Sequence, residues 1–73
     1  MTYRIIKSEN YDTEIAKVDT IEDAIKAIKD FNSKCKYPLE IAFDVDEKDD
    51  GLDAVGTDGR NRLVLFYTVK EDA

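Results

Sequence analysis

Acidic side chains are concentrated in one stretch of this 73-residue sequence, residues 44–58, which we call the acidic segment. The whole chain carries 17 acidic and 11 basic residues, a net charge of −6, and outside the segment the two kinds are equal in number. The excess charge therefore lies in one place, and it argues against direct binding to nucleic acid phosphates. Against a single lysine, the segment holds Asp44, Asp46, Glu47, Asp49, Asp50, Asp53 and Asp58.

Clustered carboxylates can bind calcium, which prefers oxygen ligands. Asp46, Asp50 and Gly51 match the first, fifth and sixth positions of an EF-hand loop. Lys48 stands at the third position, and Thr57 stands at the twelfth, where the motif has a bidentate glutamate. A strand pattern rather than a helix precedes the loop, so the spacing does not predict a metal site.

Catalytic residue types are scarce. The chain has no histidine, which removes the commonest general base and every nucleophile that histidine activates. Cys35 lies between Lys34 and Lys36, with no base or second cysteine near it in the sequence. Paired carboxylates could hydrolyse glycosides, but that reaction needs a cleft that a hairpin on so small a domain does not supply. We expect neither an enzyme nor a cofactor.

The elements that position these residues follow from periodicity. Residues 3–8 and 13–18 favour a hairpin of two strands. Residues 20–34 are predicted to form an amphipathic helix, with Thr20 or Asp19 as its first cap. After Pro38, alternation from Leu39 to Val45 predicts a strand with one buried face. Further strands are expected at 52–57 and 60–70, and Asp58-Gly59 is expected to adopt the left-handed conformations of a tight turn. The helix face consists of Ile21, Ala24, Ile25, Ile28 and Phe31.

These elements predict one α+β domain over residues 1–73, in the order β-β-α-β-β-β. A single amphipathic helix packs on one face of a four- to five-stranded antiparallel sheet. No apolar stretch reaches the length that spans a bilayer, the N-terminus lacks a secretory signal pattern, and the single cysteine cannot form an internal disulfide. We expect a cytoplasmic protein.

One helix leaves the other sheet face uncovered, and the last strand is apolar on both sides. Alternation places Leu63, Leu65, Tyr67 and Val69 on one face and Val64 and Phe66 on the other. Adjacent Ile5 and Ile6 repeat the pattern in the first strand. Val64, Phe66 and one of these isoleucines therefore form a candidate dimer or partner face, although single exposed apolar residues are also ordinary.

The segment from Asp19 to Ile25, which follows the first hairpin, resembles strand-strand-helix modules that include antitoxins of the HicB type. Helix capping and amphipathicity account for these seven residues, and no function is carried over from them. In size, acidity and lack of catalytic residues, the chain is similar to small phage-encoded inhibitors of host defence.

The leading functional hypothesis is a small non-enzymatic protein-binding module. As an inhibitor, it would present a nucleic-acid-mimicking acidic surface, made by the acidic segment, to a basic partner such as a nucleic-acid-binding enzyme. One alternative is a homodimeric module that pairs through the helix-free sheet face, and another is an immunity or antitoxin protein that neutralises a toxin. A charged segment can also serve only solubility and protection of sheet edges.

Overall fold

The computed structural model describes residues 2–46 and 51–72. One helix packs on a five-stranded antiparallel sheet, as the sequence predicts, and the elements follow one another in the order β-β-α-β-β-β. Their bounds are β1 Thr2–Ser8, β2 Asp12–Val18, α1 Ile21–Ser33, β3 Glu40–Asp46, β4 Gly51–Thr57 and β5 Leu63–Asp72.

The last strand of the chain lies in the middle of the sheet. The strand order is β2-β1-β5-β4-β3, so β5 joins the N-terminal hairpin to the hairpin of β3 and β4. Val69 is aligned with Ile5 of β1 on one side and with Leu52 of β4 on the other, and all three side chains are buried. This row of apolar residues across three strands forms a part of the core that the sheet contributes.

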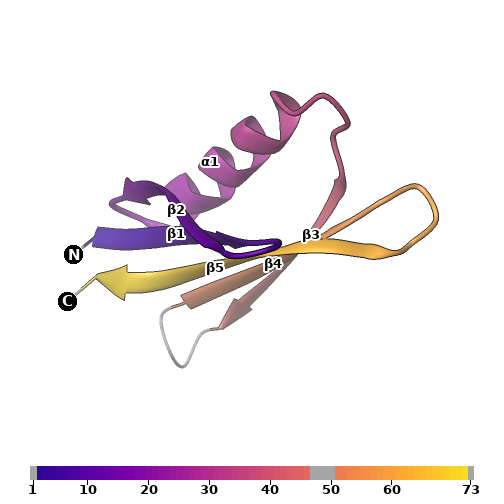
Figure 1. Ribbon diagram of the computed structural model, residues 1–73. Helices are drawn as coiled ribbons and strands as arrows, with labels where there is room; N and C mark the ends of the chain where they lie inside the picture. The colour runs from indigo at the N-terminus through magenta and orange to yellow at the C-terminus, as the bar shows by residue number, and fades with distance from the viewer. Residues whose placement is uncertain (1, 47–50, 73) are drawn as a thin grey trace.

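The helix begins where a capping residue satisfies its first turn. The Thr20 side-chain oxygen accepts a hydrogen bond from the backbone N–H of Asp23 at 3.0 Å, which decides between the two predicted caps. Ala24 and Ile28 on the inner face are fully buried. The helix packs against β1, β2 and β5, while β3 and β4 extend beyond its cover (Figure 1).

The Asn32 side chain binds the end of the connection that leads from the helix to β3. The Asn32 amide nitrogen donates to the carbonyl of Leu39 at 2.8 Å, and its amide oxygen accepts from the Leu39 N–H at 2.9 Å. The Leu39 side chain lies so close to Gly56 that a Cβ at that glycine would be 2.9 Å from it. Asn32 thereby fixes the start of β3 against the core.

A register irregularity at the beginning of β5 changes which side chains of the strand point to each face of the sheet. Gly56 is aligned with Leu65 but Thr57 with Leu63, so the register shifts by one residue and leaves Val64 between the two pairs. Leu63 is 54% exposed instead of continuing the buried row of Leu65. The alternation expected from Leu63 onward therefore does not hold at the first two residues of the strand.

The turn between β4 and β5 also differs from the expectation. Asn61, with a φ of 59°, has the left-handed conformation. Neither Asp58 nor Gly59 has a positive φ. The N–H of Asn61 donates to the carbonyl of Asp58 at 3.0 Å, and the N–H of Asp58 donates to the carbonyl of Arg62 at 3.0 Å. The prediction for Asp58-Gly59 was wrong because the turn places its left-handed residue later, where asparagine is tolerated.

Candidate functional site

Two aspartates of the acidic segment face each other across neighbouring strands. Asp44 of β3 is aligned with Asp53 of β4, and both are exposed. Their chain neighbours Phe43, Leu52 and Ala54 pack in or against the core, which lies on the side of the sheet that carries the helix. Because side chains alternate along a strand, the two aspartates lie on the helix-free face of the sheet.

Like charges directly opposite each other in an antiparallel pair destabilise the sheet. The Asp44–Asp53 pair therefore does not serve sheet stability, and a cationic group placed between the two carboxylates would relieve their repulsion. The pair is the part of the acidic segment that the structure brings together. Asp46 is aligned with Gly51 at the end of β3. The side chain of Asp46 and all of Glu47, Asp49 and Asp50 lie outside the described residues.

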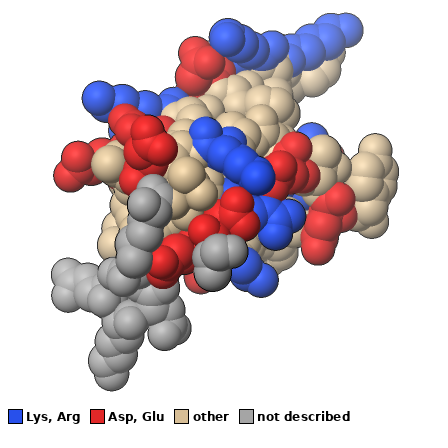
Figure 2. Space-filling model, turned by 90° about the vertical axis from the view of Figure 1, so that its left-hand side faces the viewer, with Lys and Arg blue, Asp and Glu red and all other residues tan. Residues whose placement is uncertain are grey.

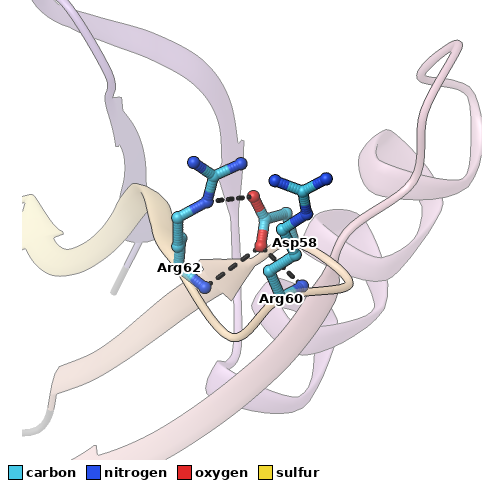
Figure 3. Close-up of polar contacts among 3 residues, drawn as sticks. All are labelled: Asp58, Arg60 and Arg62. Carbon is cyan, nitrogen blue, oxygen red and sulfur yellow. Dashed lines mark hydrogen bonds and ion pairs between the residues drawn. The ribbon is translucent and has the colours of Figure 1, made fainter.

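Asp58 lies at the other end of the hairpin and is engaged within its own turn (Figure 3). Its carboxylate accepts hydrogen bonds from the backbone N–H groups of Arg60 at 2.8 Å and Arg62 at 3.1 Å. The Nε of Arg62 also donates to it at 3.2 Å. These backbone bonds, followed by the charge of Arg62, hold the pKa of Asp58 below its usual range. Asp58 thus closes the turn, away from the Asp44–Asp53 pair.

A lowered pKa in the folded state makes Asp58 stabilising at neutral pH, and this stabilisation is lost as the pH falls from about 4 through the folded-state pKa. Replacing Asp58 with asparagine should therefore lower the free energy of unfolding at pH 7, and the difference from the wild type should shrink in acid. Urea unfolding at a series of pH values measures this. A difference that stays constant from pH 7 to pH 2 would contradict the role of the ionised carboxylate.

Basic residues share the helix-free face with the aspartates. Arg4 of β1 forms an ion pair with Glu14 of β2. The Nζ of Lys17 in β2 lies 3.3 Å from the Oδ2 of Asp72 in β5. Figure 2, which looks at the end of the molecule with both termini, shows basic and acidic side chains interleaved. These ion pairs thus engage acidic residues from outside the acidic segment. Strand alternation could have placed Arg4 and Lys17 on this face, but the sequence does not show which strands are neighbours.

The predicted apolar patch on this face is present in altered form. Phe66 is 46% exposed and is aligned with Val55 of β4, and Val55 is aligned with Ala42 of β3. Of the two isoleucines, Ile5 is buried beneath the helix and Ile6 is half-buried on the opposite face. Val64 does not belong to this row, because the register shift places it beside a hollow at the end of the helix.

That hollow, of about 350 Å³, lies between the C-terminal end of α1 and the start of β5. Phe31, Leu65 and Tyr67 line it together with exposed Cys35. Burial raises the pKa of the Tyr67 hydroxyl, and the nearby Cys35 and Glu9 add to this effect. The Sγ of Cys35 donates to the carbonyl of Phe31 at 3.4 Å. Asn32, which also lines the hollow, bonds to the backbone of Leu39, so the polar groups of Asn32 and Cys35 are engaged within the fold.

Comparisons of the chain with protein-family models, curated proteins and solved structures find no match. Among the side chains that the structure describes, no group of three or more histidines, cysteines, aspartates or glutamates could hold a metal ion. Of the loop considered for calcium, residues 47–50 and the side chain of Asp46 lie outside those residues. No helix within residues 2–46 and 51–72 is long and apolar enough to cross a membrane.

Proposed function

We propose that the protein is a non-enzymatic binding module that uses the acidic end of its sheet, around Asp44 and Asp53, to contact a basic surface on a partner protein. The aligned carboxylates of Asp44 and Asp53 carry this proposal. A partner's lysine or arginine relieves their mutual repulsion. Because this repulsion is present in the free protein, its relief adds to the free energy of binding. A nucleic-acid-binding enzyme presents such a basic surface, and occupying that surface makes the module an inhibitor.

The double variant Asp44→Asn with Asp53→Asn tests this electrostatic contact. With fluorescent decalysine as the probe at low salt, we expect the variant to bind about tenfold more weakly, which corresponds to about 1.4 kcal/mol. The control is Glu22→Gln with Glu71→Gln, which changes the net charge equally at exposed positions elsewhere. Equal weakening in the two double variants would show that net charge alone attracts the probe, and it would overturn the proposed site.

The second candidate is a homodimer that pairs through the helix-free face. The observation that favours it is the exposure of Phe66 beside Val55 and Ile6, three apolar residues on a face without a covering helix. Light scattering on concentrated protein separates the two candidates, since the first requires no self-association. An immunity or antitoxin protein would use the acidic contact of the first candidate on a toxin.

A further inference from the structure

The sheet has two outer strands, β2 and β3, each paired with a neighbour on one side. An outer strand directs unpaired backbone N–H and C=O groups outward, and an extended segment of another chain can pair with them as an added strand. The two outer strands differ in their suitability for this pairing. The difference follows from their registers and from the elements beside them.

The outer edge of β2 is irregular. Ile5 is aligned with Ala16, but the next residue of β1, Ile6, is aligned with Glu14, so Ile15 has no aligned residue on β1. Such a bulge bends the strand and increases its twist, which interrupts the regular spacing of its outward groups. The helix also follows directly after this strand and packs against it. Strand addition at β2 is therefore disfavoured.

The outer edge of β3 is regular along its whole length. Seven consecutive residues are aligned with β4, from Glu40 opposite Thr57 to Asp46 opposite Gly51, without a shift in register. The strand runs out beyond the cover of α1 (Figure 1). On the helix side, Ile41 and Phe43 are half-buried and Val45 is 50% exposed. These three residues continue the core to the edge of the sheet, where an added strand with apolar side chains would cover them.

The charges on β3 select the chemistry of the added strand. Glu40 and Asp44 are exposed, and they alternate with the apolar residues of the same strand. A second copy of β3 paired antiparallel about Phe43 would set Glu40 opposite Asp46, which places acidic residues in register and repels the copy. A segment that alternates apolar residues with lysine or arginine complements both faces, because its cations would lie beside Asp44.

We propose that β3 binds an extended segment of alternating apolar and basic residues from a partner protein, which pairs with it as a sixth strand. This inference rests on the proposed function, since it specifies how the basic partner is bound. Backbone pairing supplies affinity along the strand, and the position of the cations beside Asp44 supplies specificity and orientation.

The test uses a peptide of about eight residues that alternates lysine and valine, together with two versions that are N-methylated on alternate backbone amides. Methylation of the amides that face β3 removes the donors and blocks pairing, whereas methylation of the other set leaves that edge intact. We expect one methylated peptide to keep its affinity and the other to lose at least about tenfold. Hydrogen exchange should slow at the outward amides of β3 and not at those of β2.

Equal affinity of the two methylated peptides, or protection at β2 instead of β3, would overturn strand addition. The proposed function fails separately. If the methylated peptides bind equally but Asp44→Asn with Asp53→Asn still weakens binding, the acidic contact stands and strand pairing falls. If one methylated peptide is rejected while the double variant binds as the wild type does, strand pairing stands, and both the acidic contact and the preference for basic residues fall.

Discussion

Replacing Tyr67 with alanine should cost about 3–5 kcal/mol of the free energy of unfolding. The side chain is 1% exposed, in the central strand, and its ring meets the ring of Phe31 edge-on with centroids 6.4 Å apart. Its loss leaves a cavity between the sheet and the helix and removes the aromatic contact. A domain of this size has about 4–11 kcal/mol of stability in total, so the variant should be close to unfolded. Urea denaturation followed by circular dichroism measures the loss.

The neighbouring residue is a matched control for Tyr67. Phe66 lies on the same strand with its side chain on the helix-free face, 46% exposed, so Phe66→Ala should cost about 1 kcal/mol or less in the monomer. The two variants remove aromatic side chains of nearly the same size, one from the covered face of the sheet and one from the helix-free face. A Phe66→Ala variant that is destabilised as strongly as Tyr67→Ala would contradict the assignment of the covered face.

The Ile28→Ala variant should lose about 2–5 kcal/mol. Ile28 is 0% exposed on the inner face of α1, where it anchors the helix to the sheet. Alanine has the higher helix propensity, so the local effect of the substitution favours the helix, and any loss of stability comes from packing. The same denaturation measurement gives the magnitude.

Lys26→Ala provides the comparison within the same helix. Lys26 is exposed, and its replacement should change the stability by no more than about 0.5 kcal/mol. The two variants together separate the contribution of the inner face from that of the solvent face. If Ile28→Ala were as mild as Lys26→Ala, the helix would not be held to the sheet by this face.

Local patterns predicted the elements of the fold well. The three- and four-residue spacing of Ile21 to Phe31 places the helix, and alternation from Ile41 to Val45 places β3, because these periods depend only on backbone geometry. The turn after β4 was located correctly, but its left-handed residue was not. Several turn types fit the same residues, and the choice among them depends on hydrogen bonds such as those that Asp58 accepts.

The candidate site was predictable in composition but not in arrangement. The sequence contains both Asp44 and Asp53, yet only the β3–β4 register places them opposite each other, and a shift of one residue would have separated their faces. The same dependence explains Val64, which the irregularity at Gly56 removes from the face where simple alternation puts it. Asp58 was grouped with the other acids by proximity in sequence, whereas its carboxylate is engaged within the β4–β5 turn.

The sequence alone determined the helix with its apolar face, the alternating strands and a charge excess confined to residues 44–58. These are properties of neighbouring residues, and backbone periodicity is enough to reveal them. Folding added the central position of β5, the burial of Ile5 rather than Ile6, the ion pairs of Arg4 and Lys17 on the helix-free face, and the regular outer edge of β3. Such features depend on pairing between segments distant in sequence, where the burial of the whole core selects one register among many.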